Sequence, residues 1–227
     1  MGKRILKVVA FCMLLFGVVA GISRLVERKE SRQKMQPFLD HAGEYDVLFL
    51  GDSIMNTGVF PMEMWEKYGI AGYNIASYGN TLPITYWALQ NALDYAKPKL
   101  VVLDVQGVSK SYKLSGNSSD VHTAFDCYSI SKTKIEALDD LMDDPDAVDD
   151  DGVAYVDMKW EYLFTLGKYH ARWSELTDTD FHPVYNREKG AKSVIAVADV
   201  GDYDLIDENM ATEESGQTGF VYLRKII

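Results

Sequence analysis

The sequence predicts an α/β protein built around a doubly wound parallel sheet. Three short apolar runs lie at residues 46–50, 72–77 and 100–105, and helical patterns separate them. Alternation of strand and helix over so short a stretch favours parallel strands joined by helical crossovers. The third run is apolar almost throughout, as expected of a central strand that helices cover on both faces. A length of 227 residues and a hydrophobic content of 47% suit one ordinary domain.

The first predicted strand, Asp46–Leu50, ends abruptly in Gly51. The second strand lies within residues 72–77, and the third covers Leu100–Val105, with Asp104 as its one polar member. Each run is short and apolar and is followed by turn-forming residues, which is the pattern of a buried strand.

Two helices are predicted between these strands. Pro61 suits the first position of a helix over residues 60–69. Thr81 is a plausible N-cap for a second helix, and Pro98 lies beyond its end. The apolar residues of this second helix follow helical spacing: Leu82, Tyr86, Leu89 and Leu93.

The pattern is weaker after Gly107. Ser131 is a candidate N-cap for a helix with an apolar stripe over residues 135–142. An acidic loop follows at residues 143–152, and the aromatic-rich segment 158–176 is predicted to be helical in part, with core or lid packing favoured over a sugar-stacking platform. Residues 192–205 are expected to be extended, and residues 220–227 resemble the opening of an amphipathic helix.

The N-terminus has the pattern of a membrane segment. Val8–Ile22 is a continuous apolar run with three basic residues ahead of it, and no small-x-small cleavage site follows. We therefore predict a signal anchor over residues 1–23 with the body outside the cytoplasm, and a cleaved signal peptide is the alternative. Residues 24–44 are expected to be a charged, helix-prone linker, and residues 45–227 the folded domain, with a large insertion at about 108–195.

Charge and composition exclude several function classes. Beyond residue 35 the chain carries 15 basic and 32 acidic side chains, a net charge of −17, which disfavours nucleic-acid binding. An EF-hand alignment of the acidic loop fails, because it places Ala147 and Met158 where acids are needed. No zinc spacing or phosphate-binding loop is present, so we predict no metal and no cofactor. The two cysteines, Cys12 in the apolar run and Cys127 in the body, predict no disulfide within the body.

The sequence Gly51-Asp52-Ser53 directly follows the first predicted strand. A serine there lies at the carboxyl edge of the sheet, where open α/β sheets place their sites. The turn and the helix that follows offer free backbone N–H groups for an oxyanion, although a serine nucleophile also needs a base. On these three residues alone, a turn held by Asp52 explains the pattern equally well.

The wider context favours the chemical interpretation. The stretches "VLFLGDSIMNTG", "NIASYGNTLP" and "PKLVVLDVQG" together resemble the GDSL/SGNH hydrolase family, over roughly residues 45–107. This resemblance implies a flavodoxin-like three-layer α/β/α fold and acyl-ester chemistry. It implies Ser53 as the nucleophile and an oxyanion hole formed by the backbone N–H groups of Ser53 and Gly79.

Two departures from the family pattern stand out. The asparagine that completes the family's oxyanion hole is missing after the third strand, where Gln106 follows Asp104, and Asn80 or Gln106 could substitute for it. The family's Asp-x-x-His block also has no clean copy. The nearest echo is His182, which has Asp178 and Asp180 nearby but a threonine three residues before it. The other histidines are weaker candidates for the base: His170, in an aromatic setting, and His41 and His122, which are expected at the surface.

These observations lead to two hypotheses. The first is a membrane-anchored serine ester hydrolase or O-acyltransferase at the outer face of a bacterial membrane, acting on acyl esters, acetyl foremost, of envelope carbohydrate. In it Ser53 is the nucleophile, His182 the candidate base, and Ser53, Gly79 and Asn80 the oxyanion hole. The second is a non-catalytic envelope protein that keeps the fold as a binding or scaffold module. The missing final block also predicts that this chain is the front part of a longer protein.

Overall fold

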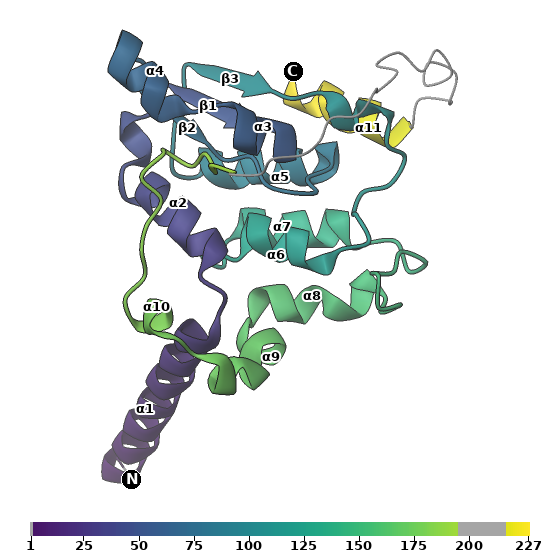
Figure 1. Cartoon of the computed structure of the whole chain (residues 1–227). Coiled ribbons are helices and arrows are strands. Elements are labelled where there is room, and N and C mark those ends of the chain that lie inside the picture. Colours follow the sequence, from purple (N-terminus) through teal and green to yellow (C-terminus); the bar gives the residue numbers. More distant parts are fainter. Residues whose placement is uncertain (1, 195–216) are drawn as a thin grey trace.

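The computed structural model describes residues 2–194 and 217–227. Within these described ranges, short strands occur only in the first half of the chain, and helices make up most of the rest (Figure 1). The main elements are α1 (Gly2–Val26), α2 (Glu30–Asp40), β1 (Val47–Leu50), α3 (Ser53–Gly58), α4 (Pro61–Tyr68), β2 (Gly72–Asn74), α5 (Leu82–Leu93), β3 (Leu100–Leu103), α6 (Ser118–Phe125), α7 (Lys132–Leu141), α8 (Tyr155–Leu163), α9 (Leu166–Tyr169), α10 (Asp178–Phe181) and α11 (Gln217–Ile226). Three 3-10 turns accompany them: η1 (Ala42–Glu44), η2 (Gln106–Ser109) and η3 (His170–Glu175).

The three strands form one open parallel sheet in the order β2-β1-β3. Leu48 on the central strand is opposite Tyr73 on β2 and Val101 on β3. The prediction of three neighbouring parallel strands is therefore confirmed, and the chain is a mixed α/β protein. The expectation that the third run is a central strand covered on both faces is wrong, because β1 lies between β2 and β3 and no residue of β3 is fully buried. β3 ends two residues earlier than expected because the carboxylate of Asp104 accepts the backbone N–H of Gln106 at 2.9 Å and turns the chain into η2.

Helices pack on both faces of the sheet, unequally. Leu48 and Leu50 face a large core that includes residues of α2, α5, α6, α7 and α8, whereas Phe49 faces a small cluster with Met55. In Figure 1, α5 lies next to the sheet, α6 and α7 form the next layer, and α8 lies beyond them. The predicted insertion therefore contributes much of the core, through buried residues such as Phe125, Leu138 and Tyr162.

Local capping signals locate the helix starts. The Thr81 hydroxyl accepts the N–H of Ile84 ahead of α5, and the Ser131 hydroxyl accepts that of Lys134 ahead of α7, as predicted. Pro61 occupies the first position of α4. α6, which the sequence analysis did not predict, begins in the same way, because the Asn117 side chain accepts the N–H of Ser119 at 3.0 Å.

The segment predicted to be a charged linker is part of the folded body. α2 runs through it and buries Met35 and Phe38, the latter fully. Ser31 also accepts the backbone N–H of Cys127, which lies in the second half of the chain. Charged residues alternate here with a buried apolar stripe. The linker prediction followed from the charged residues and overlooked the stripe.

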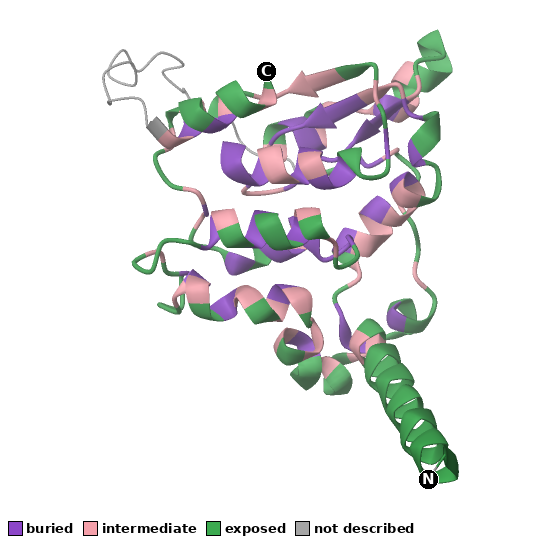
Figure 2. Ribbon diagram, turned by 180° about the vertical axis from the view of Figure 1, so that it is seen from behind, coloured by how far each residue is buried: buried purple, intermediate pink, exposed green. Residues whose placement is uncertain are grey.

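α1 extends away from the body with its apolar side chains exposed (Figure 2). Its length and composition make it a candidate membrane anchor or signal sequence. Contacts with the body begin only at its end, where Ser23 bonds Thr165 and Val26 is buried. The prediction that residues up to about Ile22 pack little against the body is confirmed.

The C-terminal end of the chain returns to the body as α11, in agreement with the amphipathic pattern of residues 220–227. Tyr222 is buried there, and its hydroxyl donates to the carboxylate of Asp140. The extended stretch expected over residues 192–205 lies outside the described residues from 195 onward.

Candidate functional site

Gly51 allows the sharp turn between β1 and α3. Its φ of +150° is unfavourable for other residues, and a Cβ atom there would lie 2.4 Å from the Cβ of Asp104. Only glycine therefore lets the end of β3 approach β1 so closely. The next residue, Asp52, caps α3, because its carboxylate accepts the backbone N–H of Ile54 at 2.9 Å.

Ser53 is the first residue of α3 and is half-buried at the carboxyl end of β1. The backbone N–H of a first helical residue has no acceptor within its own helix, so it is available to an oxyanion. Ser53 thus lies where the sequence analysis placed it, on the turn that follows a buried parallel strand.

The loop after β2 lies against this turn. The carbonyl of Gly51 accepts the backbone N–H of Ser77 and the side-chain amide of Asn80, both at 3.3 Å. Gly79, between these two donors, has a left-handed φ of +64°. The structure therefore brings the loops of Ser53, Gly79 and Asn80 together at one edge of the sheet. The side-chain oxygen of Asn80 is buried without a hydrogen-bond partner among the described residues.

Asn74 fixes the position of α3 relative to β2. This residue is fully buried, and its side-chain amide donates to the carbonyls of Met55 at 2.8 Å and Val59 at 2.9 Å. Its side-chain oxygen accepts the N–H of Ala76 at 3.1 Å. One side chain thus joins the end of α3 to the start of the loop that carries Gly79, and no alternation pattern in the sequence predicted this role.

Three carboxylates surround this edge. Burial raises the pKa of Asp52, and the neighbouring Asp104 raises it further. Asp120 of α6 lies over Gly79, so that a Cβ atom on Gly79 would be only 1.9 Å from one of its oxygens. Burial also raises the pKa of Asp120.

None of the four imidazoles is hydrogen-bonded to Ser53 within the part of the chain that the structure describes. His182, the predicted base, is exposed beside α10, and its ring nitrogen lies 3.9 Å from Asp178. The structure does not bring it to Ser53. Asp180, the other acid considered, is buried and pairs instead with Arg172 at 3.1 Å.

The remaining histidines are engaged elsewhere. His41 is exposed and pairs with Glu44, and the ring of His170 contacts the carbonyl of Gly167. The prediction that His122 is a surface residue is wrong, because only 3% of it is exposed. Its Nδ1 lies 3.0 Å from the carboxylate of Asp126, and its ring stacks on Tyr162 at 3.9 Å.

Gln106, the other suggested substitute for the missing asparagine, is exposed in η2.

The four-residue spacing of His122 and Asp126, with apolar neighbours between them, is the sequence signal that could have revealed the buried pair. The ring of His122 and the carboxylate of Asp126 hold α6 against α8 and α9, because Asp126 also accepts the hydroxyl of Tyr169 at 2.9 Å.

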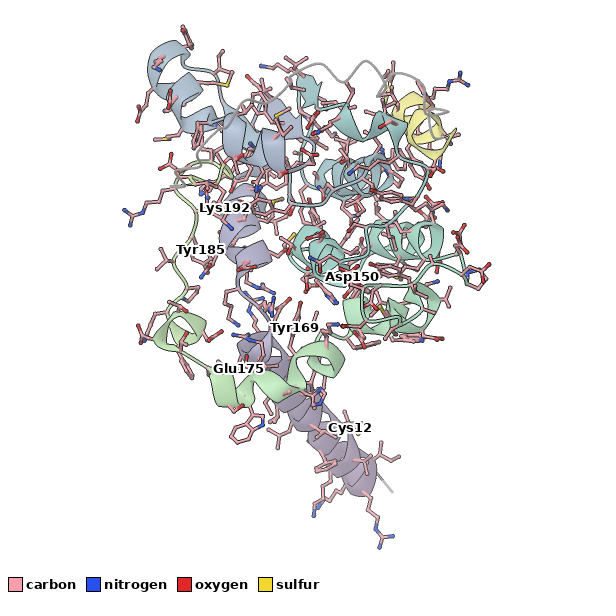
Figure 3. The ribbon with its side chains drawn as sticks, turned by 45° about the vertical axis from the view of Figure 1, so that its right-hand side comes forward. Cys12, Asp150, Tyr169, Glu175, Tyr185 and Lys192 are labelled. Atoms are coloured by element: carbon pink, nitrogen blue, oxygen red, sulfur yellow. The ribbon has the colours of Figure 1, made fainter. Side chains whose placement is uncertain are left out.

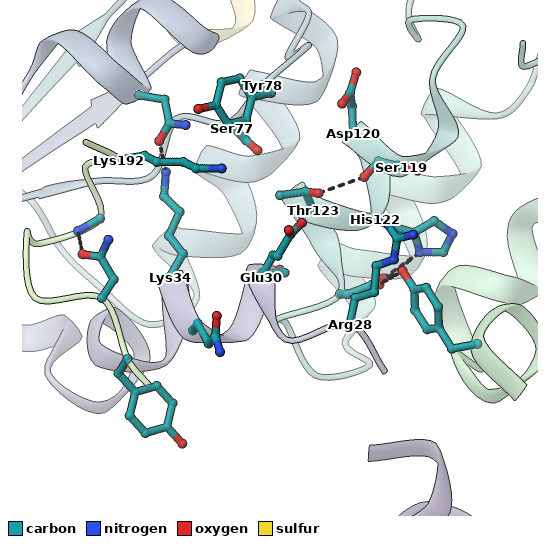
Figure 4. Close-up of a pocket in the computed structure, with 18 of the residues that line it drawn as sticks. Arg28, Glu30, Lys34, Ser77, Tyr78, Ser119, Asp120, His122, Thr123 and Lys192 are labelled. Atoms are coloured by element: carbon teal, nitrogen blue, oxygen red, sulfur yellow. Dashed lines mark hydrogen bonds and ion pairs between the residues drawn. The ribbon is translucent and has the colours of Figure 1, made fainter. Parts of the chain in front are cut away.

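A cavity of about 760 Å³ opens beside the sheet edge. Its walls come from α2, α6, α9, η3 and the segment around residues 184–192, and it reaches Asn56 of α3 and Ser77 (Figure 4). Figure 3 shows Tyr185 and Lys192, from the segment around residues 184–192, on one side and Tyr169 of α9 apart from them; all three line the cavity. No pattern in the sequence predicted this cavity, because its walls come from segments that are distant along the chain.

The described residues contain no group of three or more His, Cys, Asp or Glu side chains placed to hold a metal ion. No protein-family model, curated protein or solved structure matches the chain.

Proposed function

We propose that this chain carries the nucleophile and the oxyanion-binding groups of a serine ester hydrolase or O-acyltransferase. Its substrates would be acyl esters, acetyl foremost, of carbohydrate in a bacterial cell envelope, with α1 as the membrane anchor and the body on the extracytoplasmic face. The observation that carries the proposal is the position of Ser53 at the start of α3, with the Gly79 loop tied to the same turn through the Gly51 carbonyl. A flavodoxin-like three-layer arrangement is part of this proposal.

The reaction proceeds through an acyl-enzyme. The Ser53 oxygen attacks the ester carbonyl and its proton passes to a base, while the backbone N–H groups of Ser53 and Gly79 bind the oxyanion. The ester C–O bond then breaks and the leaving alcohol takes the proton. Water or a sugar hydroxyl releases the acyl group in a second, equivalent step.

The base for this reaction is not one of the four imidazoles in their described positions, as their hydrogen bonds show. We therefore expect the chain by itself to hydrolyse p-nitrophenyl acetate no faster than its Ser53→Ala variant. Catalytic groups act as a unit, so a nucleophile without its base loses most of the rate.

The same observation favours a second candidate function. A non-catalytic envelope protein that uses this edge and the adjoining cavity for binding would need no base at Ser53. Added imidazole distinguishes the two functions, because a small base can substitute for a missing side chain at an otherwise competent site.

The experiment measures p-nitrophenyl acetate hydrolysis by the full chain in detergent, with and without imidazole. The proposed enzyme gives equal rates for the wild type and Ser53→Ala without imidazole, and a faster wild type with imidazole. Equal rates in both conditions would leave only the binding module. A Ser53-dependent rate without imidazole would retain the esterase and assign the base to this chain.

A further inference from the structure

Two lysines meet at the end of the cavity nearest the sheet (Figure 4). Lys34 reaches this point from α2, and its ammonium donates to the side-chain oxygen of Asn56 at 2.6 Å and to the carbonyl of Ala76. Lys192 enters from the segment after α10, and its ammonium lies 4.8 Å from the centre of the Tyr78 ring. The backbone N–H of Lys192 donates to the carbonyl of Asn56 at 2.9 Å, which fixes it beside Lys34.

Within the described residues, neither lysine forms an ion pair. Two other cations that line the cavity do have carboxylate partners: Arg172 pairs with Asp180 at 3.1 Å, and Lys168 with Glu161 at 3.6 Å. Arg28, at the α1 end of the cavity, forms no ion pair among the described residues either, but it does not lie beside the two lysines. The contrast is notable in a chain whose formal net charge is −11. Two adjacent ammonium groups with only neutral partners repel each other, and an anion between them would relieve that repulsion.

The surroundings suit an oxyanion on a polar molecule. An ammonium group has three N–H donors, and Lys34 uses two of them on Asn56 and Ala76. The lining supplies further neutral hydrogen-bonding groups, among them Gln33 and Ser77. Glu30 and Asp120 also line the cavity; Figure 4 shows them on other parts of its wall, away from the two lysine ammonium groups.

We propose that Lys34 and Lys192 bind the oxyanion group, a carboxylate or a phosphate, of the molecule whose acyl ester Ser53 attacks. The role of Ser53 in this inference rests on the proposed function, whereas the binding of the anion by the two lysines does not. Asn56, which holds Lys34, follows Ser53 by one turn of α3. Three helical residues rise about 4.5 Å, so a ligand held by the lysines beside Asn56 would extend along α3 to bring its ester to Ser53.

The test measures binding of glucuronate, inorganic phosphate and neutral glucose to the full chain in detergent by calorimetry. A charge-assisted hydrogen bond contributes about 1.5–3 kcal/mol, which corresponds to roughly 10- to 100-fold in affinity. Lys192→Met should weaken binding of the anion by that factor, and Lys192→Arg should largely retain it. Lys192 is exposed, so these substitutions spare the core, whereas Lys34→Met serves as a second variant after its melting temperature is checked.

The matched control is Lys225→Met. Lys225 is another exposed lysine over a tyrosine ring, at 4.0 Å from the centre of Tyr222, and it lies on α11 outside the cavity. It should leave binding unchanged. Glucuronate binding assigns a sugar carboxylate, and phosphate binding alone assigns a phosphate group.

Any of three results would overturn the inference: anion binding that does not depend on Lys192, glucose binding as tight as that of glucuronate, or no binding of either anion. Ser53→Ala should bind the anion as the wild type does. Lys192-dependent binding without any Ser53 chemistry would therefore retain the anion site and refute only the esterase.

Discussion

Asn74→Leu should destabilise the protein through lost hydrogen bonds and not through lost volume, because the two side chains have similar shapes. The substitution leaves the N–H of Ala76 and the carbonyl of Val59 without their partner, whereas the Met55 carbonyl keeps the N–H of Val59. Each buried group left unpaired costs about 1–3 kcal/mol. Burial of the leucine methyl groups offsets roughly 1–2 kcal/mol of that total. We expect a net loss of about 2–3 kcal/mol in the free energy of unfolding, the middle of the roughly 0–5 kcal/mol that these values span.

The assay is urea unfolding of the full chain in detergent, followed by circular dichroism. Asn91→Leu is the matched control, because Asn91 is also buried but donates only to the carbonyl of Trp87, which α5 already bonds within the helix. It should cost no more than about 1 kcal/mol. If the two variants are equally stable, Asn74 does not anchor α3 and the account of how Ser53 is positioned is wrong.

Three further predictions follow from the same contacts. Gly51→Ala should lower the free energy of unfolding by at least about 1–3 kcal/mol, because of its positive φ and the approach of Asp104. Gly58→Ala, with open space around it, should be neutral or slightly stabilising in the same urea unfolding assay. A chain that starts at Ser23 should keep the native circular dichroism spectrum. A chain that starts at Gln36 should unfold, because it loses the buried Met35 and the hydrogen bonds of Ser31 and Lys34. A native spectrum for this shorter chain would mean that α2 is a linker. Burial lowers the pKa of Lys34 to about 7 in the folded protein, whereas its pKa in the unfolded chain is 10.5. Between pH 7 and pH 10.5 the unfolded chain therefore binds more protons at Lys34 than the folded protein does. The stability of the wild type relative to Lys34→Met should therefore rise as the pH rises from 7 toward 10, and a flat difference in urea midpoints would contradict this assignment.

Local signals predicted the part of the fold that local interactions determine. The three strands were recognisable from short apolar runs, and the caps Thr81 and Ser131 marked the starts of α5 and α7. Gly51-Asp52-Ser53 predicted a turn held by Asp52 with a serine at the carboxyl end of the strand, because the close approach at Gly51 needs a glycine and the hydrogen bond to Ile54 needs a short polar side chain at Asp52.

The remaining features depend on contacts between distant segments. Lys34 and Lys192 approach each other only because α2 and the segment after α10 both pack beside α3, and nothing in the sequence near either lysine indicates this. α2 was interpreted as a linker because its charges are conspicuous, although Phe38 is fully buried. His122 was misplaced for the same reason: a polar residue was assigned to the surface, although its partner, Asp126, lies one helical turn away and both are buried.

The central claim, that Ser53 is an acyl nucleophile at a prepared site, is tested most directly by locating the acyl group. The full chain in detergent is incubated with p-nitrophenyl acetate and imidazole, and acetylated serines are identified by peptide mass spectrometry. Ser119 is the internal control, since it is exposed in the first turn of α6 behind a comparable side-chain cap. We predict acetylation of Ser53 well above that of Ser119. Equal or absent acetylation of Ser53 would contradict the account.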